Sequence, residues 1–204
     1  MFDPSDRPAP DRELTDRPVL GIDPGLSRCG YGAVKRNGAR FEVVAYGVMR
    51  TDPKDPLPTR LAALEADLEA LVAEIEPGAV AVERVLFQVN ARTAISVGQA
   101  SGLALAVAAR AGVAVVQYSP NEVKLAVTGD GAADKVAVQT MVTKLLDLPR
   151  APQPPDAADA LALAICHAGT GRVRAAVGVA DVGPAPARGF ERAVAAALAR
   201  DGAR

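Results

Sequence analysis

Cysteine, histidine and tryptophan are almost missing from this chain of 204 residues, and their scarcity excludes several kinds of site. There are two cysteines, Cys29 and Cys166, one histidine, His167, and no tryptophan. So few cysteines and histidines exclude a zinc finger and a disulfide scaffold, and they exclude a Ser-His-Asp triad built anywhere but around His167. Cys166 and His167 are adjacent, so they point to different faces of a helix, and we expect both to be structural.

Long apolar runs and an excess of one charge are also lacking. No stretch reaches 18 consecutive apolar residues, and the N-terminus has no hydrophobic signal region, so we expect a cytoplasmic protein. The formal net charge is −1, which by itself does not indicate a polyanion-binding protein. If bound cations neutralise the internal acids described next, the remaining surface is mildly basic and compatible with nucleic acid.

Four carboxylates stand in apolar surroundings that ordinary surface acids do not share. Asp23 and Glu83 each end an apolar run, whereas Asp156 and Asp159 open an apolar helix. An acid at the end of a buried strand is costly to desolvate unless a positive charge meets it. Arg84 is the one basic residue that stands beside any of them, so we expect a shared divalent cation, Mg²⁺ or Mn²⁺.

Taken singly, each acid has a simpler interpretation. Asp23 before Pro24 can be a capping residue in a turn, Asp156 an N-cap, and Asp159 a first-turn acid. The set of four favours a shared site, because two metal ions about 4 Å apart can clamp the attacking and leaving oxygens of a phosphoryl displacement. In such a site Asp23 bridges the metals, with Glu83 on one side and the helical pair on the other.

The hydrophobic periodicity predicts an α/β domain with a mixed five-stranded sheet flanked by helices. Asn37-Gly38 marks a hairpin, and Pro77-Gly78 ends a helix. Asp23 and Glu83 lie side by side if the first and fourth strands are neighbours. The expected strands are 19–23, 30–35, 40–51, 79–85 and 114–118, and the expected helices are 61–75, 91–110, 121–127, 135–146 and 156–168.

The two ends of the chain differ in composition from this domain, 19–168. Residues 1–18 are rich in Pro, Asp and Arg and predict a disordered leader. Residues 169–204 predict a mobile basic tail, with a possible short helix at 190–200. Within the domain, the helix 91–110 is low in charge and rich in Gly and Ala. Such a surface packs closely, either against its own sheet or, as we favour, against a second subunit.

Several segments, taken in order, resemble the RuvC-type Holliday-junction resolvases. A lone Asp-x-Gly is a weak signal, but the ordered set between Val19 and His167 is highly specific. The resembling segments are Leu20–Gly25, Gly30–Gly32, Val82–Val85, Gly98–Gly102 and Asp156–Ala162.

The resemblance implies a ribonuclease H-like fold for the domain 19–168, a homodimer, and a four-way DNA junction as substrate in recombination and repair. It implies Mg²⁺-dependent paired nicks in two strands of like polarity, with two Mg²⁺ ions per site and Mn²⁺ as a possible substitute. It also implies a branch-migration complex of RuvA and RuvB type as partner. The residues that match the family's catalytic, metal-binding carboxylates are Asp23, Glu83, Asp156 and Asp159.

Lys124 and Lys135 stand where the family uses lysines near the scissile phosphate. The resemblance implies a catalytic Lys124, which stabilises charge in the transition state, and a DNA-binding Lys135. The alternative is a solvated lysine on a helix face. The loop Gly129-Asp130-Gly131 between them can approach backbone phosphates closely, provided that Asp130 points away.

The loop after the fourth strand departs from the family pattern. The family commonly has an aromatic residue three positions after the strand glutamate, where Leu86 stands here, and Phe87 follows one position later. Either Leu86 is the wedge against unpaired bases or the loop shifts to present Phe87, unless Phe87 is buried under the loop. Asn90 and Arg92 in the same loop are further candidates for DNA contacts.

Three other functions share part of the pattern. Sugar kinases and actin-like ATPases have a similar Gly-Ile-Asp-x-Gly turn, but they need two duplicated lobes, and this chain is too short for both. Fold relatives that process ribosomal RNA precursors are shorter and lack the long Gly/Ala-rich helix. A non-catalytic junction-binding scaffold has no use for four acids that repel DNA. We therefore expect a metal-dependent endodeoxyribonuclease.

Overall fold

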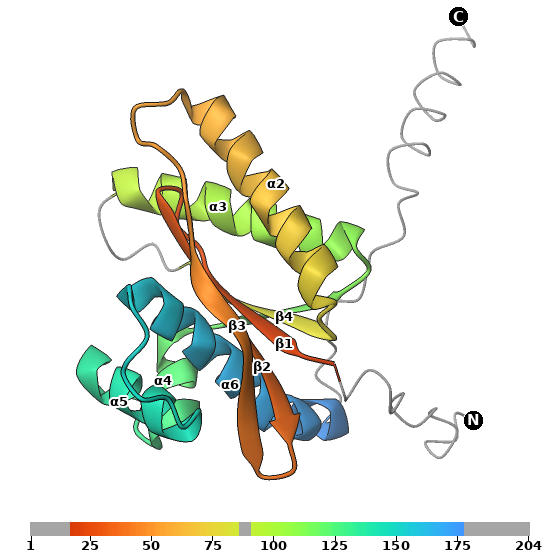
Figure 1. The fold of residues 1–204 in the computed structure, drawn as a ribbon, viewed down its shortest axis with the longest axis vertical. Helices are drawn as coiled ribbons and strands as arrows, with labels where there is room; N and C mark the ends of the chain where they lie inside the picture. Colours follow the sequence, from red (N-terminus) through yellow and green to blue (C-terminus); the bar gives the residue numbers. More distant parts are fainter. Residues whose placement is uncertain (1–16, 86–90, 178–204) are drawn as a thin grey trace, which may run out of the picture.

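The computed structural model describes the backbone of residues 17–85 and 91–177, and the side chains of residues 17–85 and 94–170. Five strands and the helices around them form three layers, with the sheet in the middle (Figure 1). The strands are β1 (Val19–Asp23), β2 (Arg28–Asn37), β3 (Arg40–Arg50), β4 (Ala79–Glu83) and β5 (Ala114–Tyr118). The helices are α2 (Leu57–Ile75), α3 (Ala91–Arg110), α4 (Pro120–Thr128), α5 (Lys135–Leu145) and α6 (Pro155–Val177).

The sheet is mixed, as the sequence predicts. Its strand order is β3-β2-β1-β4-β5. The hairpin β2–β3 is antiparallel, β1 pairs antiparallel with β2, and β1, β4 and β5 are parallel to one another. The first and fourth strands are therefore neighbours, which is the arrangement that the predicted site requires.

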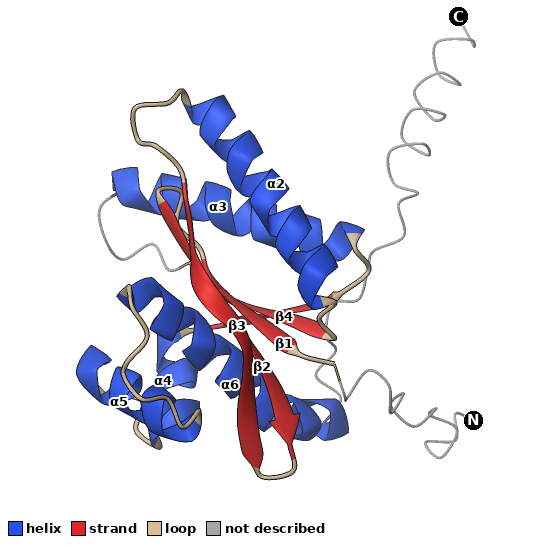
Figure 2. Ribbon diagram, viewed as in Figure 1, coloured by secondary structure: helices blue, strands red, loops and turns tan. Residues whose placement is uncertain are grey.

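Helices cover both faces of the sheet, and each face has its own apolar core (Figure 2). Helices α2 and α3 pack on one face, over a core that includes Leu20, Ile22 and Val82. Helices α4, α5 and α6 pack on the other face, over Val34, Ala81 and the apolar residues of α6. Each fully buried Val, Leu or Ile contributes about 1.5–3 kcal/mol to the free energy of folding.

Glycines in β1 and β2 let α6 lie directly against the sheet. A Cβ atom on Gly21 would overlap the carbonyl oxygen of Ala160, and one on Gly30 would overlap the carbonyl oxygen of Asp156. Because backbone meets backbone at these points, no side-chain rotation could make room. The glycines therefore set how closely the first turns of α6 approach the end of β1.

The element bounds differ from the sequence prediction in a few places. Helix α2 begins at Leu57 rather than Leu61, since Pro58 falls in its first turn, where proline is favourable. Helix α6 runs on to Val177, past the predicted boundary at Ala168. The Thr170 hydroxyl donates to the Cys166 carbonyl (2.6 Å) and Gly169 abuts Phe41, so the Gly-Thr-Gly sequence does not end the helix. The predicted leader, the distal tail and the possible helix at 190–200 lie outside the described residues, apart from Arg17 and Pro18.

Of the helices that the structure describes, none combines the length and the hydropathy that a bilayer crossing requires. Both cysteines are buried, and no disulfide joins them. Burial raises the pKa of Cys29 to about 12, so this thiol stays protonated and acts as a small apolar core residue.

Gly30→Ala tests the close approach of α6 to the sheet. We expect it to lower the free energy of unfolding by about 1–3 kcal/mol or more, because the new methyl group must push the Asp156 backbone away. Gly169→Ala is the control in α6, the helix that Gly30 contacts, because an added Cβ there makes only ordinary contact with Phe41 and should stabilise by up to about 1 kcal/mol. Urea unfolding measures both. Equal effects of the two substitutions would contradict the packing argument.

Candidate active site

Strand alternation places Asp23 and Glu83 on the same face of the sheet. In β1, Leu20 and Ile22 face α2 and α3, so Asp23 faces α6, as Gly21 does. In β4, Val80 and Val82 likewise face α2 and α3, so Glu83 faces α6. Ile22 pairs with Val82 in the parallel ladder, and the two acids are the next position on each strand. They therefore lie side by side at the carboxyl ends of adjacent strands.

Helix α6 brings the other two carboxylates to this edge. Asp156 falls in its first turn and Asp159 follows three residues later, so the two lie on neighbouring positions of one helix side. The close contact between Gly30 and the Asp156 backbone places that turn next to Gly30, the register partner of Asp23. The positive end of the helix dipole also favours carboxylates there.

The electrostatics show that the four acids influence one another. Burial raises the pKa of Asp23 to about 7, and the negative charges of Glu83, Asp159 and Asp156 add to the rise. Burial also raises the pKa of Glu83, with Asp159 adding to it. Negative charge is therefore concentrated around Asp23 beyond what the protein itself neutralises, as expected for groups that hold a cation.

Two basic residues pair with the helical acids, and neither is a neighbour of these acids in the sequence. Lys135 donates from Nζ to Asp159 Oδ2 (2.6 Å), and this hydrogen bond raises the pKa of Lys135. Arg28 Nε lies 3.6 Å from Asp156 Oδ2. Arg84 instead donates to the backbone carbonyl of Gln117 (3.1 Å).

The residues present fit a divalent cation, although their side chains do not form a ready-made ligand set. Asp156 Oδ2 is a buried oxygen without a hydrogen-bond donor, and Asp23 is surrounded by negative charge. Across the described ranges, no three Asp, Glu, His or Cys side chains are grouped tightly enough to hold a metal as they stand. Repulsion among the acids and the turn of Asp159 toward Lys135 account for this spread. A cation would have to draw the acids together.

Lys124 lies on α4, which begins directly after β5 at the same edge of the sheet. Glu83 pairs with Tyr118, the last residue of β5, and Ser119 caps α4 through a reciprocal bond with Glu122. Lys124 is half-buried in the second turn of that helix. In the described part of the chain it forms no ion pair, so it is a cation close to the acid-bearing edge that is not committed to an acid.

Asp130, in the loop between α4 and α5, is exposed and bonds to its own loop. Asp130 Oδ1 accepts a hydrogen bond from the backbone N–H of Ala132 (2.8 Å), and the Asp130 N–H donates to Thr128 (3.1 Å). Gly129 ends α4 with a φ of 81°, in the left-handed region. The carboxylate is thus hydrogen-bonded within its own loop, and the approach of this loop to phosphate stays a prediction.

The remaining predicted site residues are not placed. Leu86, Phe87 and Asn90 lie outside the described residues, and Arg92 belongs to α3 but its side chain is outside them too. The choice between Leu86 and Phe87 as a wedge therefore stays open.

The structure adds contacts that sequence reasoning missed. Tyr118 Oη lies 2.8 Å from Nδ1 of His167, and both side chains are buried. This bond joins the end of β5 to α6, and it supports the structural interpretation of His167. Arg28 was also missed. The available signal was its position two residues before Gly30, which puts it on the face of β2 that meets α6.

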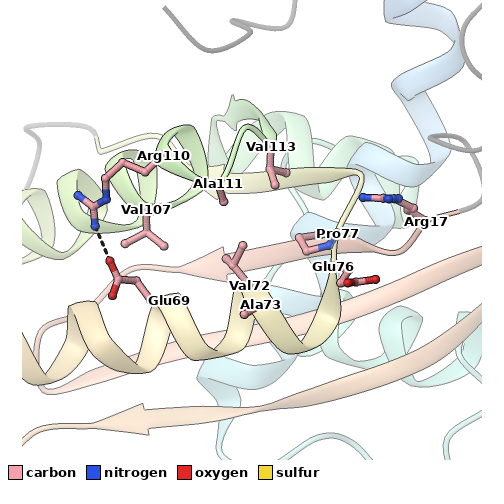
Figure 3. A pocket seen from close by; sticks show the side chains of 10 residues that line it. All are labelled: Arg17, Glu69, Val72, Ala73, Glu76, Pro77, Val107, Arg110, Ala111 and Val113. Carbon is pink, nitrogen blue, oxygen red and sulfur yellow. Dashed lines mark hydrogen bonds and ion pairs between the residues drawn. The ribbon is translucent and has the colours of Figure 1, made fainter. Parts of the chain in front are cut away.

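A hollow of about 540 Å³ lies at the opposite edge of the sheet (Figure 3). It lies between the carboxyl ends of α2 and α3, where Arg110 donates to Glu69 (2.8 Å). Arg17, Pro77 and Val113, which precede β1, β4 and β5, also line it. Because the acids lie at the carboxyl ends of these parallel strands, the hollow is separate from the candidate site.

Comparisons with known proteins agree with this geometry. A family model described as "Crossover junction endodeoxyribonuclease RuvC" matches residues 19–167. A protein of that description from Salinispora arenicola is 55% identical over 163 residues, covering 79% of this chain and 93% of the relative.

Solved structures show the same fold. The structure described as Thermus thermophilus RuvC in complex with Holliday junction substrate is similar with a TM-score of 0.73 and 37% identity, over 77% of this chain and 96% of that one. The yeast mitochondrial Holliday junction resolvase Ydc2 is similar with a TM-score of 0.54 and 17% identity, over 77% of this chain and 84% of that one. At that identity the second likeness concerns the fold alone, which is ribonuclease H-like, as predicted.

The raised pKa of Asp23 predicts how the metal-free protein responds to pH. The folded state binds this proton more tightly than the unfolded state, so stability falls as pH rises from about 4, the ordinary pKa of Asp, to about 7. Asp23→Asn should remove most of this dependence and stabilise the metal-free protein at pH 8 by at most about 4 kcal/mol. Urea unfolding in EDTA at pH 5 and pH 8 measures it.

Added Mg²⁺ provides the companion measurement. It should stabilise the wild type at pH 8 more than the Asn variant, because a cation that binds only the folded state adds to its stability. Parallel pH profiles for the two proteins, with equal effects of Mg²⁺, would show that Asp23 is not the centre of the charge cluster.

Proposed function

The chain belongs to the RuvC family of crossover junction endodeoxyribonucleases, and we propose that it resolves four-way DNA junctions by paired, Mg²⁺-dependent nicks in two strands of like polarity. It is a metal-dependent DNA endonuclease of that family. The observation that carries the proposal is the meeting of four carboxylates from β1, β4 and α6 at one edge of the sheet. A junction substrate is consistent with the structural likeness to the Thermus thermophilus protein bound to a Holliday junction.

We assign the cation sites to Asp23, Glu83, Asp156 and Asp159. Two Mg²⁺ ions per site, with Mn²⁺ as a possible substitute, would supply Lewis-acid stabilisation of the attacking and leaving oxygens. Asp23 lies centrally, since the charges of all three other acids act on it. Its carboxylate is suited to bridge two ions, while Glu83 and the helical pair hold one side each.

The lysines supply positive charge beside the acids. Lys135 neutralises Asp159 in the absence of DNA and metal. A Lys135 ammonium that is not paired with Asp159 would hold a DNA phosphate as a point charge. Lys124, which has no acidic partner within the described ranges, is placed to stabilise charge that develops on the reacting phosphate.

A homodimer follows from the surface of α3. Between Ile95 and Ala109, its exposed positions recur at helical spacing and carry small or apolar side chains, with Ile95 63% exposed. An added Cβ on Gly98 or Gly102 would meet nothing within 4 Å. This stripe is therefore not used against the chain's own sheet, and it suits a close contact with the same helix of a second copy. Two active sites related by a two-fold axis match the symmetry of a junction.

Further parts of the proposal concern the surroundings. Leu86 or Phe87 would act as a wedge against unpaired bases, and Asn90 and Arg92 would contact the DNA. A branch-migration complex of RuvA and RuvB type would deliver the junction, in the cytoplasm, where chromosomal DNA lies. The basic segment 169–204 would add to DNA affinity without a role in the chemistry.

Asp23→Asn is the direct test of the proposed function. The variant should bind a four-way junction but fail to nick it, because Asn keeps the shape and removes the charge, whereas binding depends on phosphate contacts elsewhere. Gel assays of junction nicking with and without Mg²⁺ measure the activity, with linear duplex, RNA–DNA hybrid and single strand as comparisons, and circular dichroism monitors the fold. Nicking at close to the wild-type rate would exclude Asp23 from the centre.

Lysine substitutions separate chemistry from binding. Lys124→Ala should lower the single-turnover rate at saturating enzyme by roughly 10²–10³-fold, with a much smaller change in junction affinity. Lys135→Ala should weaken binding and reduce the salt slope by about 1. Lys144→Ala, an exposed position in the last turn of α5, is the control and should change neither. If Lys124→Ala altered affinity alone, its assignment to the reacting phosphate would be wrong.

A further inference from the structure

Two arginines face each other at the end of the β2–β3 ladder that lies nearest the acids. Arg28 and Arg50 are direct register partners in the antiparallel pair. Arg60 of α2 fastens this end of the hairpin, since it donates to Ser27 Oγ (2.7 Å) and Thr51 Oγ1 (3.0 Å), the residues next to the pair. The two strand ends are therefore held together with like charges opposite each other.

Like charges at directly opposite positions destabilise a β-ladder, because their Cβ atoms are only about 4.5–5.5 Å apart. In the described part of the chain, Arg50 has no ion pair, and the one acid near Arg28 is Asp156, at 3.6 Å. Arg28 is 54% exposed, and Arg50 is exposed. The pair thus presents more positive charge to solvent than the protein compensates, which an anion between the guanidinium groups would relieve.

The pair lies on the same face of the sheet as the acids. Arg28 is two residues from Gly30, whose Cβ direction points at Asp156, and alternation puts both on the side of α6. Strand order places the lysines and arginines apart, with the acids between them. The helices with Lys124 and Lys135 follow β5 at one end of the sheet, and the arginines belong to the hairpin at the other end (Figure 1).

We propose that Arg28 and Arg50 form a phosphate-binding subsite for the cleaved DNA strand, beside the scissile phosphate on the β2–β3 side of the acids. Guanidinium groups bind phosphate oxygens in pairs of parallel hydrogen bonds, which fixes direction as well as position. The strand then runs from the lysine side, across the four acids, to the arginine pair. This inference rests on the proposed function, because it assigns a contact for that same substrate.

The test compares two arginines of one strand. Arg50→Gln removes the proposed contact, and Arg40→Gln is its matched control, an exposed arginine at the far end of β3. Junction affinity is measured without added metal, at about 50 and about 200 mM salt. Loss of one phosphate contact makes the plot of log affinity against log salt concentration less steep by about 0.9. When salt rises over this range, the factor by which affinity falls should therefore be roughly 3- to 4-fold smaller for Arg50→Gln than for the wild type. Arg40→Gln should follow the wild type.

Neutral methylphosphonates, placed one at a time around the cut site, identify the phosphate. At one position next to the scissile phosphate, the substitution should weaken wild-type binding more than it weakens binding by Arg50→Gln, in which only Arg28 still holds the phosphate. Arg28→Gln and the double variant should identify the same phosphate position. The double variant should lose less junction affinity than the sum of the losses of the two single variants, since both guanidinium groups hold one phosphate.

The outcomes separate this inference from the proposed function. If the wild type neither binds nor nicks junctions, the proposed function fails and the subsite fails with it. If the wild type resolves junctions while Arg50→Gln and Arg40→Gln respond equally to salt and to every methylphosphonate, the subsite alone is wrong. A position at which the methylphosphonate weakens wild-type binding more than binding by Arg50→Gln supports it.

Discussion

The rest of the structure depends on one electrostatic constraint, the crowding of four carboxylates around Asp23. Burial and the neighbouring acids together raise the pKa of Asp23 to about 7, so the ionised cluster opposes folding when no cation is present. A protein gains nothing in stability from such an arrangement, and it persists because the surrounding packing holds it. The charge that destabilises the cluster is also what gives it affinity for divalent cations, and hence what lets it act on a phosphodiester.

Packing of α6 against the sheet is what enforces this crowding. Side chains on Gly21 or Gly30 would separate the helix from β1 and β2 by clashing with its backbone. Farther along, the buried bond between Tyr118 and His167 joins α6 to the end of β5, beside Glu83. The acids of the helix and those of the strands are thus fixed relative to each other from two directions. Small side chains and one polar contact set the geometry of a site in which they take no chemical part.

Much of this could be predicted from the sequence because it follows from local periodicity. Apolar runs ending in acids place Asp23 and Glu83 at strand ends, and the spacing of Asp156 and Asp159 puts them on one side of a helix. The bounds of β5 and α3 also agree with the prediction. The ion pairs could not be predicted in this way. Lys135 and Arg28 reach the acids from segments far away in the chain, and only tertiary packing brings them there.

These ion pairs give the cation-free site a distinct state. Lys135 and Arg28 form ion pairs with the two helical acids. Asp23 and Glu83, which lie deeper in the fold, have no such partner in the described residues. The helical acids can therefore exchange a protein cation for a metal ion at modest cost, since their partners are more than half exposed and return to solvent. Burial instead raises the pKa of both strand acids. Binding of metal and DNA then shares one set of charges, because each cation that takes an acid frees a basic side chain for phosphate.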